Sequence, residues 1–310
     1  MLTVVTSSRF ADHLTPPGHP ESPERAAVMS TVAGRFAAAG GRVVEPRQAE
    51  DADLLRVHTP AHVAAMVATR GRPVMLDDDT FTSPLSEEVA RLAAGAVLTG
   101  VDLVLDGVPG SRALALVRPP GHHAEAEKPM GFCLYNSIAV GAAYARARGL
   151  SRVAIVDYDV HHGNGTQQIF YADPSVLFVS SHQYPFWPGS GAAHERGSGA
   201  GAGATVNLPL PLGAMDEEVL ARYASEAFPV LERFQPELLL ISAGFDAHER
   251  DPLAGCRMTT GGLATLTAQL LDGATRWCEG RAVIVTEGGY DLMALEACLT
   301  AVVEVAGASR

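Results

Sequence analysis

Five short apolar runs stand out from residue 113 onward, and none shows the alternation of polar and apolar residues that marks a half-exposed strand. They span residues 113–117, 153–156, 176–179, 238–241 and 282–285. Such runs are typical of strands that are buried on both faces, as in a parallel sheet covered by helices. Strand-like and helix-like segments alternate from residue 113 onward, which indicates right-handed βαβ units. The pattern therefore predicts an α/β fold with a mostly parallel sheet.

Helices are predicted between these runs. Ser22-Pro23, Thr59-Pro60 and Ser83-Pro84 each supply an N-cap residue followed by a proline at the first helical position. Further helices are expected over residues 136–148, from 216 to a kink or break at Pro229, over 261–279 and over 292–307. The chain has no internal repeat and no proline-rich linker, so one domain over residues 1–310 is expected.

Each predicted strand runs directly into residues that could take part in chemistry. In open α/β sheets the ligand lies in the crevice beyond the carboxyl ends of the strands. We therefore expect these residues to share one site. In chain order they are His122 and His123, then Asp157, Asp159 and His161, then Ser180, then Asp246, and finally Tyr290.

Three of these residues form a candidate metal site. Asp159 and His161 are two apart, and alternate residues of an extended segment point to the same side. Asp246 could supply a third ligand from another strand end. Three protein ligands leave one position open, which is the mark of a catalytic metal site. Two carboxylates suit zinc but also iron(II) or manganese, so the spacing leaves the metal open.

The remaining strand-end residues could complete a hydrolase. A metal ion turns water into a good nucleophile near neutral pH, and His122 or His123 could take its proton. Asp157 or Asn164 could orient that histidine through its other ring nitrogen. The Tyr290 hydroxyl could stabilise the oxyanion that forms at the attacked carbonyl. These parts predict a metal-dependent amide or ester hydrolase.

Composition narrows the class of protein. Hydrophobic residues make up 47% of the chain and charged residues 19%, which argues against disorder. The net charge of −12 argues against a nucleic-acid partner held by basic patches and favours a cationic substrate. The four cysteines have no paired spacing, so we expect them to be reduced and mostly buried in a cytoplasmic protein. No signal peptide and no apolar stretch of membrane-spanning length is evident, so no membrane partner is expected.

Two other features receive structural interpretations. The glycine-rich stretch at residues 197–205 lacks the lysine of a phosphate-binding loop, and we expect a mobile loop beside the catalytic face. His162 is expected to face the core, on the opposite side of its strand end from His161. Histidines outside the strand ends are expected to be structural or exposed, namely His13, His58, His62, His194 and His248.

The motifs RPPGHHAE, GFCLYNSIAV, DYDVHHGNGTQQIF, SAGFDAHERDPL and EGGYD resemble, in this order, the histone deacetylase superfamily. That superfamily includes bacterial acetylpolyamine amidohydrolases and acetoin-utilisation proteins. The segment HPESPERAAVM is similar to the start of its class II-like and bacterial members. The resemblance extends from His13 to about Tyr290. It implies the three-layer α/β/α arginase/deacetylase fold and a zinc-dependent deacetylase.

The resemblance also implies roles for individual residues. Asn164 stands where many class I enzymes have an aspartate, which makes the chain similar to class II members. By position, the zinc ligands are matched by Asp159, His161 and Asp246, the tandem histidines by His122 and His123, and the catalytic tyrosine by Tyr290. The walls of the acyl-lysine tunnel are matched by Gly131, Phe132 and Trp187, and a structural potassium site by Asp157 and Ser180. The rim aspartate that binds the substrate backbone is matched by Asp79, with Asp78 as a rival.

The substrate is predicted from one further position. Polyamine-selective members of the family can carry an acidic residue seven positions after the last zinc aspartate, and this chain has Leu253 there. An apolar side chain cannot pair with a second ammonium group, so acetyl-lysine in peptides or proteins is expected. The alternatives are an acetylpolyamine or other small acylated amine, a catalytically silent binding protein of the same fold, and an arginase-like dimetal hydrolase. The oligomeric state is left open.

Overall fold

An eight-stranded sheet forms the middle layer of the protein, whose computed structural model describes residues 1–308. The strands are β1 (Leu2–Val5), β2 (Arg42–Val44), β5 (Arg112–Ala115), β6 (Val153–Asp157), β7 (Val176–Gln183), β8 (Thr205–Leu210), β9 (Leu238–Ala243) and β10 (Ala282–Thr286). They lie in the order β2-β1-β5-β10-β9-β6-β7-β8, and every neighbouring pair is parallel. A separate antiparallel pair is formed by β3 (Val74–Met75) and β4 (Phe81–Thr82).

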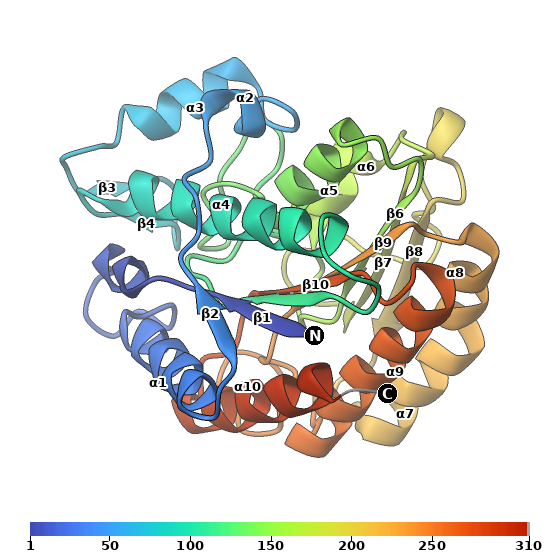
Figure 1. Cartoon of the computed structure of the whole chain (residues 1–310). Coiled ribbons are helices and arrows are strands. Elements are labelled where there is room, and N and C mark those ends of the chain that lie inside the picture. Colours follow the sequence, from blue (N-terminus) through green and yellow to red (C-terminus); the bar gives the residue numbers. More distant parts are fainter. Residues whose placement is uncertain (309–310) are drawn as a thin grey trace.

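Helices cover both faces of the large sheet, which confirms the predicted three-layer α/β/α fold (Figure 1). One face carries α4 (Ser86–Leu105), α5 (Ser137–Ala147) and α6 (Asn164–Phe170), with α2 (Asp51–Leu54) and α3 (Pro60–Val67) beyond them. The other face carries α1 (Glu24–Ala38), α7 (Asp216–Arg222), α8 (Phe228–Phe234), α9 (Thr260–Trp277) and α10 (Leu292–Gly307).

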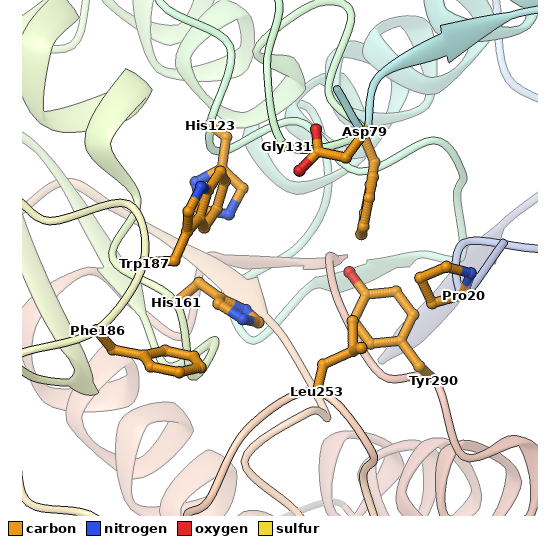
Figure 2. Close-up of a pocket in the computed structure, with 10 residues that line it drawn as sticks. Pro20, Asp79, His123, Gly131, His161, Phe186, Trp187, Leu253 and Tyr290 are labelled. Atoms are coloured by element: carbon orange, nitrogen blue, oxygen red, sulfur yellow. The ribbon is translucent and has the colours of Figure 1, made fainter. Parts of the chain in front are cut away.

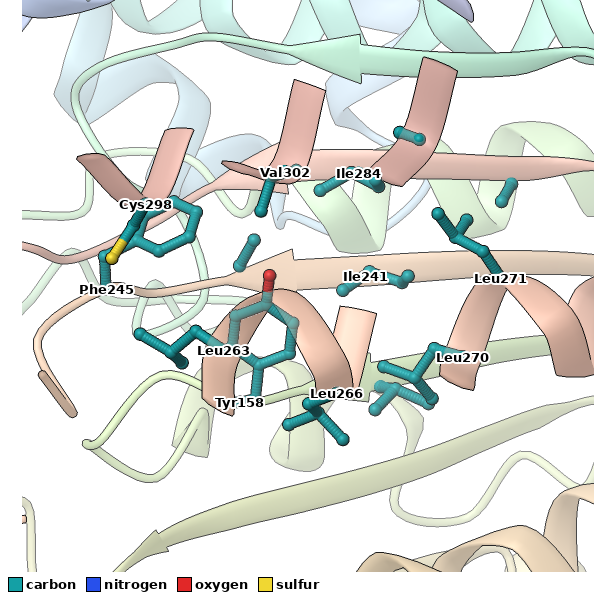
Figure 3. Packing of buried hydrophobic residues seen from close by; sticks show 14 of the residues in the cluster. Tyr158, Ile241, Phe245, Leu263, Leu266, Leu270, Leu271, Ile284, Cys298 and Val302 are labelled. Carbon is teal, nitrogen blue, oxygen red and sulfur yellow. The ribbon is translucent and has the colours of Figure 1, made fainter. Parts of the chain in front are cut away.

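Each central strand contributes side chains to two hydrophobic cores because its residues alternate between the faces of the sheet. In β10, Ile284 packs into the core under α9 and α10, while Val283 and Val285 pack into the core under α4 and α5. Figure 3 shows the first of these cores, with Ile241 and Ile284 among helix side chains such as Leu270 and Val302. Burial on both faces explains why these strands are apolar throughout.

Most of the predicted helix boundaries are confirmed. Thr59 caps α3 by accepting a hydrogen bond from the backbone N–H of His62. The break expected at Pro229 is present, because a π-helical turn at Tyr223–Ala227 separates α7 from α8 and the proline lies in the first turn of α8. The prediction that Ser83-Pro84 opens a helix was wrong. The Ser83 hydroxyl accepts from the N–H of Leu14 instead of capping, and α4 begins only at Ser86.

Three strands of the sheet were not predicted, and the glycine-rich segment was predicted at the wrong end of the sheet. β1, β2 and β8 were not predicted, and β2 and β8 are the edge strands. The glycine-rich segment 197–204 does not border the catalytic face. It lies at the opposite end of the sheet, where the N–H of Ser198 donates to the carbonyl of Tyr171 and the segment leads into the first residue of β8.

The four cysteines are all buried and unpaired, as expected. Within residues 1–308, none of the helices combines the length and the apolar character needed to cross a bilayer. His162 is buried, as predicted, and its ring contacts Ser190 and Gln167.

A buried ion network ties the N-terminal segment to the loop after β5. The Glu21 carboxylate accepts hydrogen bonds from Arg118 Nε at 2.7 Å and from Arg25 Nη1 at 3.0 Å, and His13 Nε2 lies 3.3 Å away. Glu21 and both arginines are fully buried. Burial alone would raise the pKa of Glu21, but the charge of Arg118 lowers it well below its usual range.

Replacing Glu21 with alanine is expected to destabilise the protein by roughly 3–5 kcal/mol, because two buried guanidinium groups lose their shared counter-charge. Because the folded-state pKa of Glu21 is depressed, its stabilising contribution is present above the unfolded-state pKa of about 4.3 and lost as the pH falls. Urea unfolding at pH 7 measures the change. A loss no greater than that of an exposed control such as Glu217→Ala would contradict it.

Candidate active site

The predicted site residues converge because four neighbouring strands end at the same edge of the sheet. The strands β5, β10, β9 and β6 are adjacent in this order. The loops that follow them carry, respectively, the tandem histidines, Tyr290, Asp246, and the pair Asp159 and His161. The shared edge predicted from the ends of the apolar runs is therefore present, and residues more than 160 positions apart meet there.

A pocket with a volume of about 240 Å³ opens at this edge (Figure 2). The Tyr290 hydroxyl points toward its middle, with the rings of His161 and His123 on the opposite side. The lining consists of Pro20, Asp79, His123, Gly131, Phe132, His161, Phe186, Trp187, Leu253 and Tyr290. Most of this wall is aromatic or apolar, which suits a narrow organic chain such as an acylated amine.

Asp159, His161 and Asp246 form a buried cluster in which one ligand atom of each lies within 4.8 Å of the others. His161 Nδ1 lies 3.2 Å from a carboxylate oxygen of Asp159 and 3.1 Å from one of Asp246. The backbone supports both carboxylates, since the N–H of Gly288 donates to Asp159 and the N–H of Val160 donates to Asp246. The cluster is thus rigidly built and has metal-ligand chemistry.

The charges of the cluster fit a divalent cation. Burial alone would lower the pKa of His161, but its hydrogen bonds to the carboxylates of Asp159 and Asp246 raise it to about 10. Two buried carboxylates therefore demand positive charge between them, which a proton on His161 meets only in part. A divalent ion would supply that charge and would take the neutral imidazole as a ligand.

The two tandem histidines have different partners. His122 Nδ1 lies 2.9 Å from a carboxylate oxygen of Asp157, and His123 Nδ1 lies 2.8 Å from Oδ1 of Asn164. The Asn164 amide nitrogen donates to Glu125, which fixes Oδ1 as the atom facing His123. An amide oxygen only accepts, so the proton of neutral His123 lies on Nδ1 and Nε2 carries the free lone pair.

Their pKa values move in opposite directions. Burial alone would lower the pKa of His122, but the charges of Asp157 and Asp159 raise it well above its usual range. Burial, and then the charge of His122, lower the pKa of His123 well below that range. A neutral imidazole such as His123 can accept a proton, whereas a charged one such as His122 can only stabilise negative charge or donate. Only His123 of the two lines the pocket.

Tyr290 remains a hydrogen-bond donor in this environment. Burial, and then the charge of Asp246, raise the pKa of its hydroxyl well above the usual value, so the phenol stays protonated. The Arg25 guanidinium lies 5.2 Å from the centre of the ring. A neutral phenol directed at the pocket can stabilise negative charge that develops on a substrate oxygen.

The tunnel walls depend on unusual backbone. Gly131 has φ +57°, and a Cβ there would lie 2.5 Å from the Trp187 ring, so only glycine allows the indole to close in. Phe132 follows with φ 68°, which is rare for a residue with a side chain. Its N–H donates to the Thr80 hydroxyl, which in turn donates to the Asp79 carboxylate. The rim and the tunnel wall are therefore linked through Thr80.

Of the two candidates for the rim aspartate, Asp79 lines the pocket and Asp78 is exposed, and the rim role stays a prediction. Leu253 lies on the wall beside Tyr290, as Figure 2 shows. Asp157 and Ser180 are partners in the parallel register of β6 and β7. Their side chains also contact His122 and His182, and the potassium role remains a prediction.

Several residues of the site were missed from the sequence. Phe186 stacks on the His161 ring at 5.6 Å, and Pro20 forms part of the opposite wall. Glu287 accepts hydrogen bonds from the N–H groups of Gly121 and His122, although the second is long at 3.3 Å. Pro20 lies inside the motif HPESPER and Glu287 inside EGGYD, and Phe186 is next to Trp187. Their proximity to recognised site motifs was the only sequence feature that could have indicated them.

Comparison with known proteins agrees with this geometry. The model of the histone deacetylase domain matches residues 19–306. The chain belongs to the histone deacetylase family. It is 41% identical to Histone deacetylase 15 of Arabidopsis thaliana over 299 residues, covering 93% of this chain and 52% of that protein. It is also 41% identical to a histone deacetylase-like amidohydrolase of Pseudomonas aeruginosa over 296 residues, covering 93% of this chain and 76% of that protein.

The same fold is present in a solved structure of this deacetylase family. The HDA15 HD domain superposes with a TM-score of 0.90 at 36% sequence identity, covering 99% of this chain and 91% of that one. This chain spans only about half the length of the Arabidopsis relative. Relatives named as deacetylases and as an amidohydrolase are consistent with a hydrolase, and the Asp159, His161 and Asp246 cluster is a possible metal site.

The cluster makes a direct prediction about metal retention. Asp246→Ala should abolish turnover and metal content together, because it leaves two ligands where a catalytic site uses three. Elemental analysis of the purified variant, with wild-type protein in parallel, measures the metal per chain. A variant that keeps both its metal and its activity would contradict the assignment. Glu249→Ala, an exposed acidic change in the same loop, serves as the control.

Proposed function

We propose that the protein is a zinc-dependent deacetylase that hydrolyses the acetamide of acetyl-lysine in peptides or proteins. The observation that carries the proposal is that a possible metal cluster, a neutral histidine and a protonated tyrosine face one narrow apolar pocket. Asp159, His161 and Asp246 would hold the ion. When bound, the ion would supply Lewis acidity to a water molecule and to the amide carbonyl.

The chain's own residues then divide the proton transfers. Nε2 of His123 faces the pocket with a free lone pair and takes the proton of the attacking water. Asn164 holds the ring in the tautomer that this requires. His122, paired with Asp157, stays charged and stabilises negative charge nearby without entering the pocket. The proton gathered on His123 is later given to the departing amine.

Tyr290 acts on the other side of the reacting carbon. Its hydroxyl donates a hydrogen bond to the carbonyl oxygen as that oxygen becomes negative. The acetylated side chain reaches this point between Phe132 and Trp187, whose apolar surfaces exclude water from its methylene groups. Asp79, which lines the pocket, would accept hydrogen bonds from the backbone of a peptide substrate.

The apolar pocket wall at Leu253 favours an acetylated peptide over an acetylated polyamine as the substrate. The pocket wall at Leu253 is apolar, so a second ammonium group of a polyamine finds no partner there and keeps its desolvation cost. The alternative substrate, an acetylpolyamine, is favoured by the net charge of −12, which attracts cationic molecules at long range.

Three further assignments accompany the proposal. A potassium ion bound near Asp157 and Ser180 would stabilise the base of the site, since the two residues are adjacent in register. The unpaired cysteines support a cytoplasmic location. A single deacetylase domain over residues 1–310 is supported by one continuous sheet that contains strands from both ends of the chain.

Removing only the Tyr290 hydroxyl tests the chemistry. Tyr290→Phe should lower kcat on the order of 10²-fold or more while metal content and fold persist, because an oxyanion donor is lost. Steady-state kinetics on an acetyl-lysine peptide, with metal analysis of the same sample, measure this. An unchanged kcat would show that the ring serves only packing.

A substitution at Leu253 tests the substrate assignment. Leu253→Glu should move the ratio of kcat/KM toward N8-acetylspermidine and away from an acetyl-lysine peptide, because the new carboxylate can pair with the second ammonium. Leu253→Gln is the matched control, since glutamine is polar and close to glutamate in size but carries no charge. A wild-type preference for the polyamine at the same ionic strength would refute the peptide assignment.

A further inference from the structure

The peptide bond between Gly289 and Tyr290 is hydrogen-bonded at both ends to buried side chains. Nε of Arg25 donates to the Gly289 carbonyl at 2.8 Å. On the other side of the same peptide plane, the Tyr290 N–H donates to Oδ2 of Asp251 at 2.7 Å. The two hydrogen bonds together fix the plane from which the Tyr290 side chain projects, and the one from the Arg25 guanidinium is of the stronger, charge-assisted kind.

Asp251 is built to make this contact. The residue is 8% exposed and lies in the loop that follows Asp246. Its two oxygens have separate tasks. Oδ1 accepts from the N–H of Leu253 at 3.0 Å within the same loop, while Oδ2 crosses to Tyr290 and, at 3.4 Å, to the N–H of Asp291.

The site gives a reason for such a grip. Gly289 has φ +118°, and a Cβ there would lie 2.9 Å from Phe245, so the turn before Tyr290 is tight and accepts only glycine. A flexible turn would let the phenol swing. The hydroxyl must instead wait at the position where the oxyanion forms, and small displacements of such a donor cost rate.

We propose that Asp251 is a positioning residue for the deacetylation reaction, which aligns the Tyr290 hydroxyl through the backbone N–H of Tyr290 and sets the Leu253 wall with the same carboxylate. The proposal rests on the proposed function for its kinetic consequence. Its structural content, that Asp251 holds the Tyr290 turn, stands on the two hydrogen bonds alone.

Asparagine at this position separates the two tasks. In Asp251→Asn the remaining oxygen can still accept from Leu253, as asparagine commonly does in local turns. The new amide group then faces the Tyr290 N–H, so a donor meets a donor and the contact between the loops is lost. The matched control is Arg250→Gln. It removes the exposed Arg250–Asp291 ion pair, which joins the same two loops at 3.3 Å but is screened by solvent.

A double-mutant cycle with Tyr290→Phe measures whether Asp251 acts through the hydroxyl. In the wild-type background, Asp251→Asn should lower kcat on an acetyl-lysine peptide on the order of tenfold to a hundredfold, with little change in KM. In the Tyr290→Phe background the same change should alter kcat less than about twofold, because no hydroxyl remains to be aligned. Equal losses in both backgrounds would overturn the proposal.

Hydrogen–deuterium exchange supplies a readout that needs no turnover. Asp251→Asn should speed exchange in a peptide covering residues 288–291, and Arg250→Gln should leave that exchange unchanged. Unchanged exchange in Asp251→Asn would overturn the proposal. If the wild-type protein fails to turn over any acetylated amine while the exchange result is as expected, the proposed function fails and the hold on the Tyr290 turn stands.

Discussion

The burial of two carboxylates around one imidazole is the constraint on which the rest of the site depends. Asp159 and Asp246 are almost fully buried and both face His161. Charges of the same sign in a low-dielectric site are costly unless positive charge lies between them. The neighbouring parts follow from this demand. Backbone N–H groups of Val160 and Gly288 satisfy the remaining oxygens, and a charged His122 lies next to the cluster.

Burial and nearby charge together separate the roles of the groups around the cluster. Burial, and then the charge of Asp246, keep the Tyr290 phenol protonated, while the charges of Asp157 and Asp159 keep His122 charged. Burial, and then the charge of His122, hold His123 neutral, so the site contains a donor, a cation and a base. Asn164, rather than an ionised partner, completes the arrangement because it fixes a tautomer without adding charge to His123.

The sequence was sufficient for the central strands and the residues that follow them. A reactive residue placed directly after a doubly buried apolar run is visible from local pattern alone, which is why Asp159, Asp246 and Tyr290 were found. Edge strands gave no such signal: β2 is partly exposed and β8 contains a proline. Contacts between loops were also invisible, since Asp251 and Tyr290 are 39 positions apart and nothing local to either one reveals the other.

The most direct test of a metal-dependent site is turnover of an acetyl-lysine peptide by protein stripped of metal with a chelator and then titrated with zinc. Stripped protein is expected to be inactive, and activity should return in proportion to added zinc and reach its maximum at one ion per chain, held by Asp159, His161 and Asp246. Full activity in the stripped protein, or a requirement for two ions per chain, would contradict it.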